Sequence, residues 1–275
     1  MLNTENFDNT PKVKSSRINR LPPNPEEKNP LKVVGPGRFP SWLHRKLPKG
    51  GDLWKTGKVL NENRLHTVCE EANCPNLLEC WSKNTATFLA MGKACTRNCG
   101  FCDIDFTKTP VALDPQEPSR IAESVKQLNL SHVVITMVAR DDLPDGGASH
   151  LAEVVAEVRR QSPESTIELL TSDLKGDTQA LDTILAANPE IFNHNIETVR
   201  ELTPRVRHKA TYDRTLEVLK YMSCHKSPSM LVKSGMMVGL GETEEQVFQT
   251  IRDLHQAGTH IITMGQYLQP NHHKL

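Results

Sequence analysis

The chain has 275 residues, of which 37% are hydrophobic, and this is enough for one large domain or two small ones. The lysine and arginine residues balance the aspartate and glutamate residues to a formal net charge of zero, so no global field favours nucleic acid or an anionic membrane surface. No apolar run approaches the roughly 20 residues of a membrane helix, and the N-terminus lacks an apolar signal region. We therefore expect a cytoplasmic protein that binds neither nucleic acid nor a membrane.

The N-terminal part of the chain carries little apolar periodicity. Residues 1–40 are rich in Pro, Asn, Lys and Glu, a composition typical of a disordered extension. Residues 42–66 are polar with scattered apolar positions, and we expect a short helix or two there. The N-terminal segment, 41–84, ends where a different pattern begins at about residue 85. The sequence therefore predicts an extension, an N-terminal segment and a larger domain at 85–275.

In the larger domain, short apolar runs alternate with helical patterns. Leu151, Val154, Val155 and Val158 form an i, i+3, i+4, i+7 stripe that predicts one such helix. Six runs are strand candidates: 86–91, 132–138, 166–170, 190–196, 230–238 and 260–264. Strands that alternate with helices indicate an α/β fold with parallel strands and helical crossovers. Six such units fit either an open doubly wound sheet or an incomplete barrel.

Helix boundaries are marked by two capping signals. Asp177 is an N-cap residue for the helix that contains Leu181 and Ile184. Thr243 and Gln246 have the spacing of a capping box before the last helix. The glycines just upstream, Gly239 and Gly241, do not continue into a G-x-G-x-x-G dinucleotide fingerprint.

The cysteines are clustered. Of seven, six lie at positions 69, 74, 80, 95, 99 and 102, and the seventh is Cys224, which we expect to be a partly buried thiol without a role. In a cytosolic chain of this size, clustered cysteines more often bind metal or do redox chemistry than form disulfides. Two triplets therefore need separate interpretations.

The later triplet, Cys95, Cys99 and Cys102, has the spacing Cys-x3-Cys-x2-Cys and follows the first strand candidate. Three thiolates on one short loop can ligate three irons of a [4Fe–4S] cube and leave the fourth iron open. The alternatives are a zinc site or inert buried thiols. Zinc favours closed sites with four ligands, and no histidine stands at knuckle spacing, so a zinc site is less favoured than a cluster. Inert buried thiols are less favoured still.

This spacing, with Phe101 just before the last cysteine, resembles the radical S-adenosylmethionine (SAM) superfamily. The earlier triplet, Cys69, Cys74 and Cys80, has the spacing Cys-x4-Cys-x5-Cys, and the two spacings in this order resemble the lipoyl synthase family. The resemblance implies a partial (βα)6 TIM-type barrel with an N-terminal cluster-binding extension. It also implies two [4Fe–4S] clusters, with the earlier triplet at 41–84 holding an auxiliary cluster that donates sulfide. The alternative for that triplet is a structural cluster or a zinc site.

Four further motifs extend the resemblance over residues 40–274: 140–147, 192–198, 235–242 and 265–270. Each follows or ends a strand candidate, where active sites of parallel barrels form. Asn195 and Glu197 are period-two neighbours that face one side of a strand and suit ribose hydroxyls. Arg207, in preference to Arg205, suits the carboxylate of SAM.

Two glycines are the candidates for contact with the adenine of SAM. Gly239 and Gly241 let the backbone approach a flat adenine. The resemblance then implies radical-mediated insertion of two sulfur atoms into an octanoyl group on a lipoyl carrier domain, of a 2-oxoacid dehydrogenase E2 or a glycine cleavage H protein. A ferredoxin or flavodoxin would supply electrons. The rivals are a radical SAM enzyme whose auxiliary cluster transfers electrons, and a non-enzymatic iron–sulfur carrier.

The chain departs from the family pattern near its C-terminus. The family has an Arg-Ser-Ser stretch there, in which a serine supplies the fourth ligand of the auxiliary cluster, whereas no serine follows Ser234 here. Three explanations are open: the sequence is a fragment, the cluster takes another fourth ligand, or the chain has lost sulfur donation. Of these we expect a truncated sequence, which also lacks the last barrel helix. His272 and His273 are expected in a surface tail.

Overall fold

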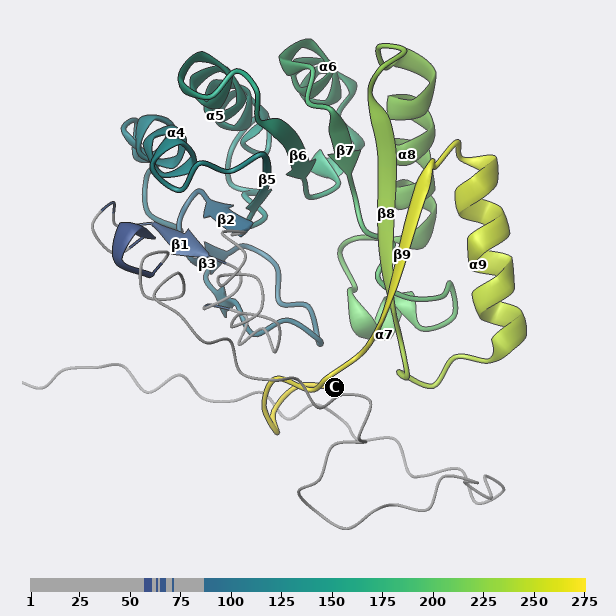
Figure 1. Ribbon diagram of the computed structural model, residues 1–275. Coiled ribbons are helices and arrows are strands. Elements are labelled where there is room, and N and C mark those ends of the chain that lie inside the picture. Colours follow the sequence, from purple (N-terminus) through teal and green to yellow (C-terminus); the bar gives the residue numbers. More distant parts are fainter. Residues whose placement is uncertain (1–56, 61–62, 64, 68–70, 72–86) are drawn as a thin grey trace, which may run out of the picture. The chain divides into compact units, whose positions relative to one another are not determined.

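The computed structural model describes residues 57–60, 63, 65–67, 71 and 87–275 (Figure 1). The expected extension at 1–40 lies outside the described residues, and so does most of the segment at 41–84. The described strands form a seven-stranded sheet in the order β1-β2-β5-β6-β7-β8-β9 and a two-stranded sheet of β3 (Ala94–Cys95) and β4 (Asp105–Phe106). Their bounds in the large sheet are β1 His66–Thr67, β2 Thr87–Ala90, β5 His132–Met137, β6 Thr166–Leu170, β7 Ile191–Asn193, β8 Leu231–Val238 and β9 Ile261–Gln266.

Helices connect successive strands of this sheet from β2 to β9. They are α4 Glu117–Gln127, α5 Ala148–Gln161, α6 Thr178–Ala187, α8 Tyr212–His225 and α9 Glu244–Gln256. Every pairing from β2 to β9 is parallel, whereas β1 runs antiparallel to β2. The expectation of six strands joined by five helices is therefore confirmed.

The strand order decides between the two architectures that the sequence left open. A doubly wound sheet reverses its order at a switch point, which places helices on both faces. From β2 to β9 the strands instead follow the order of the chain without reversal. Figure 1 shows the helices along one face of the curved sheet, as in a barrel, and the described strands β1 and β9 stand at its two edges.

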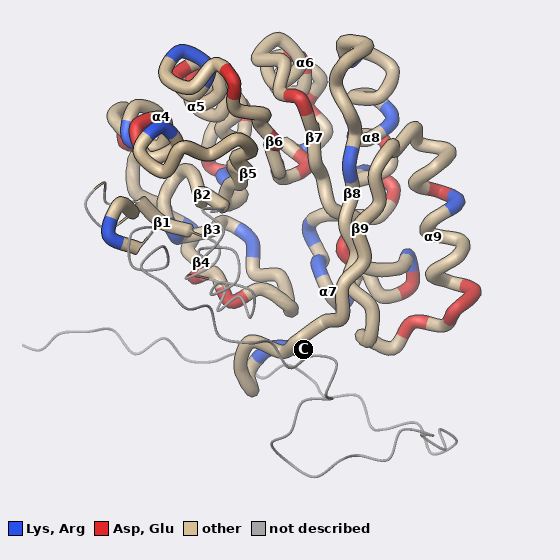
Figure 2. The backbone as a smooth tube through the Cα atoms, viewed as in Figure 1, with Lys and Arg blue, Asp and Glu red and all other residues tan. Residues whose placement is uncertain are grey.

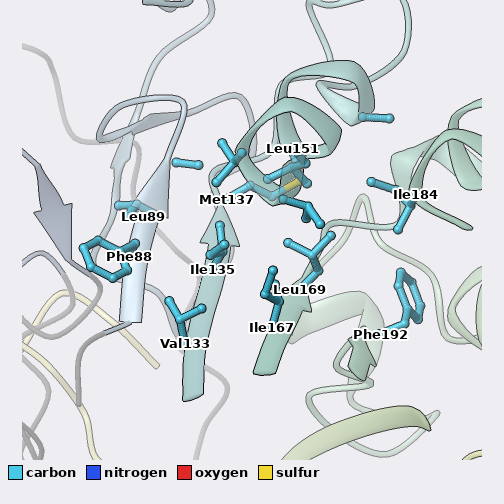
Figure 3. Close-up of a cluster of buried hydrophobic side chains, with 14 of the residues drawn as sticks. Phe88, Leu89, Val133, Ile135, Met137, Leu151, Ile167, Leu169, Ile184 and Phe192 are labelled. Atoms are coloured by element: carbon cyan, nitrogen blue, oxygen red, sulfur yellow. The ribbon is translucent and has the colours of Figure 1, made fainter. Parts of the chain in front are cut away.

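The main core lies between the sheet and its helices (Figure 3). Ile167 and Leu169 on β6 alternate with residues of the opposite face, and both are fully buried beneath the helices. The predicted stripe on α5 supplies Leu151, Val154, Val155 and Val158 to the same core. Apolar residues that recur every two positions on the strand and about every 3.6 positions on the helix therefore lie in the same core.

Both predicted helix caps are confirmed. The Asp177 carboxylate accepts a hydrogen bond from the Gln179 amide at 2.9 Å, at the start of α6. Thr243 and Gln246 exchange two bonds at the start of α9: the Thr243 amide donates to Gln246 Oε1 and the Gln246 amide donates to Thr243 Oγ1. These bonds satisfy amide groups that a helix cannot pair internally.

The sheet edge at β9 and the neighbouring helix α9 expose large apolar side chains. Met264 on β9 is 56% exposed, and Phe248 on α9 is 48% exposed. Within the described residues, no helix has both the length and the apolar composition needed to cross a membrane.

Candidate active site

The later cysteine triplet lies on a loop that begins in a small sheet. Strand β3 (Ala94–Cys95) pairs in parallel with β4 (Asp105–Phe106), and Cys99 and Cys102 lie in the turn between them. The Cys102 amide donates to the Cys99 carbonyl at 3.3 Å, and the Arg97 amide donates to Cys95 Sγ at 3.3 Å. All three thiols are half-buried. The short sheet and these turn bonds fix three sulfur atoms on one loop, as the sequence predicted.

Hydrogen bonds tie this loop to the C-terminal end of β5. Both the amide and the hydroxyl of Thr96 donate to the Ala139 carbonyl, at 3.0 and 2.9 Å. The Thr96 hydroxyl also accepts from the Asp141 amide at 3.0 Å. On its other side, the loop is held by the Gly100 amide, which donates to the Val206 carbonyl at 2.8 Å. The cysteine loop therefore lies against the C-terminal edge of the sheet, where parallel barrels carry their active sites.

A buried arginine strengthens the same attachment. Arg97 donates two bonds to Asp141, at 2.9 and 2.7 Å, and one to Asp173 at 2.6 Å. Arg214 approaches Asp173 from the other side at 3.4 Å. Burial opposes ionisation of both carboxyls, but the Arg97 guanidinium holds the pKa of Asp141 and of Asp173 below the usual range. Charges of both signs are visible along this edge in Figure 2.

The three thiols are close enough to influence one another. Burial is the main cause that raises the pKa of Cys99 to about 12, and the neighbouring Cys102 and Cys95 raise it further, whereas Arg207 opposes the shift. Burial likewise raises the pKa of Cys102, against the Ile104 amide that hydrogen-bonds to it. Among the described residues, no three His, Cys, Asp or Glu side chains converge on one ion-sized point. Thiolates are soft donors, and three of them on one short loop suit an iron–sulfur cluster.

Asn195 and Glu197 come together as predicted, but for a different reason. Strand β7 ends at Asn193, and Glu197 adopts a left-handed conformation with φ of 65°. The Glu197 backbone bridges to β8, donating to the Gly235 carbonyl at 3.0 Å and accepting from the Met237 amide at 2.8 Å. The period-two argument was therefore wrong, because the two residues lie beyond the strand.

Gly235 on β8 makes room for this pair. A Cβ atom at Gly235 would lie 2.7 Å from Asn195 Oδ1, so the Asn195 amide occupies the space that a side chain would need. Burial raises the pKa of Glu197, while Arg207 and the Asn195 side chain oppose the shift. The carboxyl of Glu197 thus lies in a desolvated position beside a cation.

Arg207 is the buried member of the arginine pair. It is 4% exposed, whereas Arg205 is exposed, and it follows the short helix α7 (Thr203–Val206). Arg207 Nη1 donates to the Asn195 carbonyl at 2.8 Å and Nη2 donates to Thr215 Oγ1 at 2.6 Å. Its buried Nε has no hydrogen-bond partner among the described residues. Burial lowers the pKa of Arg207, and the nearby Glu197 and Cys99 oppose this.

The two candidate glycines follow β8 at the rim. Gly239 and Gly241 have φ of 99° and 109°, a left-handed region that favours glycine. Gly239 borders a cavity of about 250 Å³, but Gly241 does not. The residues that line this cavity come from the segment around α7 and from the ends of β8 and β9: Leu202, Arg205, Val206, Gly239, Leu240, Tyr267, Gln269 and Leu275.

The remaining sequence predictions concern the other four cysteines and two histidines. Cys69, Cys74 and Cys80 lie outside the described residues, so their arrangement stays a prediction. Cys224 is exposed at the end of α8, and the expectation of a partly buried thiol was wrong. His272 and His273 are exposed, as expected. Sequence reasoning missed Arg97, although this residue stands inside the cysteine motif.

Comparison with known families fits this site. The model of the Radical SAM superfamily matches residues 89–254, which span the cysteine loop and the strands β5 to β8. The chain is therefore a member of the radical SAM superfamily, a class whose chemistry uses a [4Fe–4S] cluster and SAM. The model of the N-terminal domain of lipoyl synthase matches residues 4–74. Proteins named lipoyl synthase are 65% and 52% identical to most of this chain, which therefore belongs to the lipoyl synthase family within the superfamily.

Relatives from bacteria support this membership. A lipoyl synthase from Protochlamydia amoebophila (strain UWE25) is 65% identical over 98% of this chain and 83% of its own length. A lipoyl synthase from Chlamydia muridarum (strain MoPn / Nigg) is 52% identical over 90% of this chain and 80% of its own length.

Solved structures with low sequence identity show the same fold. Methylornithine synthase (PylB) has a TM-score of 0.54 with 14% identity, over 78% of this chain and 64% of that one. The FeFe-hydrogenase maturase HydG from Carboxydothermus hydrogenoformans has a TM-score of 0.54 with 14% identity, over 78% and 48%. The expected α/β radical SAM partial barrel is confirmed.

Proposed function

We propose that this lipoyl synthase family member inserts two sulfur atoms into an octanoyl group carried on a lysine of a lipoyl carrier domain. The observation that carries the proposal is the convergence of three thiols on one loop with Arg207 and Glu197 at the C-terminal edge of the sheet. Cys95, Cys99 and Cys102 hold the first [4Fe–4S] cluster in this proposal. When bound, that cluster supplies the electron for SAM cleavage, and a second cluster supplies sulfide.

The described residues suit the parts of SAM that need recognition. The unpartnered Arg207 Nε offers a buried donor for the carboxylate of SAM, because an arginine fork pairs well with a carboxylate. Asn195 and Glu197 present an amide and a carboxyl for the ribose hydroxyls. Gly239 borders the cavity at the end of β8 where the backbone can approach adenine, with Gly241 at the adjoining turn.

The remaining assignments belong to the same proposal. Cys69, Cys74 and Cys80 hold the auxiliary cluster within a segment at 41–84, which follows the extension at 1–40 and precedes the partial barrel at 85–275. The substrate carriers are a 2-oxoacid dehydrogenase E2 or a glycine cleavage H protein. A ferredoxin or flavodoxin donates electrons, and the protein acts in the cytoplasm.

Product analysis tests the proposal. Anaerobically reconstituted protein is incubated with SAM, a reductant and an octanoylated carrier domain, and the carrier is weighed by mass spectrometry. We expect a mass increase that matches two inserted sulfur atoms, and about eight irons per chain, four for each cube. SAM cleavage with a sulfur-free product would contradict sulfur insertion while leaving the fold assignment intact.

A further inference from the structure

A chain of buried hydrogen bonds runs from the end of β6 to Arg207. His194, just after β7, has its Nδ1 2.9 Å from the Thr171 carbonyl and its Nε2 3.2 Å from the Thr215 hydroxyl on α8. The same hydroxyl lies 2.6 Å from Arg207 Nη2. His194 is 3% exposed and Thr215 is fully buried. His194 and Arg207, from two different segments, thus both contact the hydroxyl oxygen of Thr215.

The chemistry of the groups fixes the direction of each bond. Arginine can only donate, so the Thr215 oxygen accepts from Arg207. The Thr215 hydroxyl hydrogen is then available to donate to His194 Nε2. With Nε2 as the acceptor, Nδ1 carries the ring hydrogen and donates to the Thr171 carbonyl, which can only accept. With a neutral His194, each of these three hydrogen bonds therefore has one donor and one acceptor.

The lowered pKa of His194 agrees with a neutral ring in this arrangement. Burial, followed by the adjacent Arg207 cation, lowers the pKa of His194 to about 4. The ring therefore stays neutral at neutral pH and keeps an acceptor lone pair for Thr215.

We propose that Thr215 and His194 are positioning residues that hold the Arg207 fork in the orientation that receives the carboxylate of SAM. This inference rests on the proposed function of Arg207. The Thr215 oxygen and the Asn195 carbonyl fix one hydrogen on each terminal nitrogen, which leaves Nε free. Without the Thr215 hydroxyl, one buried N–H of Arg207 loses its partner. The guanidinium then has a competing partner in the nearby carboxyl of Glu197.

The test compares Thr215→Val, which keeps the shape but removes the hydroxyl, with Thr215→Ser, which keeps the hydroxyl. SAM affinity is measured by equilibrium dialysis on reconstituted holoprotein, with iron content and melting temperature recorded for each variant. We expect Thr215→Val to raise the Kd for SAM about ten-fold, the size of one hydrogen bond to a charged group, with iron content unchanged. Thr215→Ser should bind SAM within about two-fold of the parent protein.

A second pair of variants tests the same inference if Thr215→Val does not fold. The side chain of His194→Gln can still accept from Thr215, whereas that of His194→Asn reaches only toward Thr171. We expect His194→Asn to weaken SAM binding more than His194→Gln does. Equal SAM affinity within either pair of folded, fully loaded variants would overturn the positioning role.

Arg207→Gln separates this inference from the proposed function. Loss of SAM affinity in Arg207→Gln, together with unchanged affinity in Thr215→Val, contradicts only the positioning role. Unchanged affinity in Arg207→Gln contradicts the assignment of Arg207 to the carboxylate of SAM, and the positioning role falls with it.

Discussion

At the scale of single residues, the buried Arg97 side chain attaches the cysteine loop to the ends of two strands of the sheet. It is 7% exposed and bonds to two carboxylates, Asp141 and Asp173, of which Asp173 is fully buried. Removal of one member from a buried ionic group leaves uncompensated charge, which costs more than the intact group contributes.

We therefore predict that Arg97→Gln lowers the free energy of unfolding by about 3 to 5 kcal/mol. Urea unfolding of the metal-free protein measures this, with the exposed Arg252→Gln as the control, which should change the free energy by less than about 1 kcal/mol. A similar small effect for Arg97→Gln would contradict the assigned role.

His194 gives the protein a specific sensitivity to acid. Its folded-state pKa is lowered to about 4, below the ordinary value of 6.5. Between these two values the unfolded chain binds a proton that the folded protein does not, so the free energy of unfolding falls as the pH is lowered from 6.5 towards 4.

We predict that this contribution reaches on the order of 3 kcal/mol near pH 4 and is absent from His194→Gln. Denaturant unfolding at several pH values measures it. Parallel pH profiles for the two proteins would show that His194 does not make this contribution.

At the scale of secondary-structure elements, one carboxyl joins α4, α5 and the turn after β2. Glu117 at the start of α4 accepts from the Met91 amide at 2.8 Å and lies 2.7 Å from His150 Nε2 on α5. Met91 has φ of 69° and leads toward the cysteine loop. The contact therefore fixes a strained turn at the base of that loop.

We predict that Glu117→Ala destabilises the fold by about 3 kcal/mol, because two buried nitrogens lose their partner. Glu123→Ala on the exposed face of the same helix is the matched control and should cost less than about 0.5 kcal/mol. Thermal and urea unfolding of the two variants give the comparison, and equal stability of both would refute the role of Glu117.

The sequence predicted the long elements better than the short ones. Hydrophobic stripes and caps such as Asp177 and Thr243 arise within one element, so they are readable from local spacing. By contrast, β3 and β4 have two residues each, too few to show a period. The 3-10 turn at Leu174–Gly176 and the short helix α7 were missed for the same reason.

The candidate site shows the same division. The spacing of Cys95, Cys99 and Cys102 was visible because all three lie on one loop. The contact of Arg207 with Thr215 was not, because it depends on how α8 packs against the residues after α7. Tertiary contacts of this kind leave no local pattern. The match of Asn195 with Glu197 was predicted from strand periodicity, yet it arises from the left-handed turn at Glu197.

At the scale of the whole molecule, a parallel sheet wound in one direction brings distant motifs to one edge. The cysteine loop follows β2, Arg140 to Asp142 follow β5, Asn195 and Glu197 follow β7, and Gly239 follows β8. Since the C-terminal ends of parallel strands meet at one edge, residues far apart in sequence become neighbours there. The fold thus explains how motifs up to about 140 residues apart in the chain come to lie at one edge of the sheet.

The central claim is that the later triplet alone holds the cluster that acts on SAM. Formation of 5′-deoxyadenosine after reduction tests it most directly, measured in the parent protein, in Cys99→Ala and in Cys69→Ala. We predict that Cys99→Ala forms none, whereas Cys69→Ala still cleaves SAM but yields no sulfur-containing product. Cleavage of SAM that survives in Cys99→Ala would contradict the account.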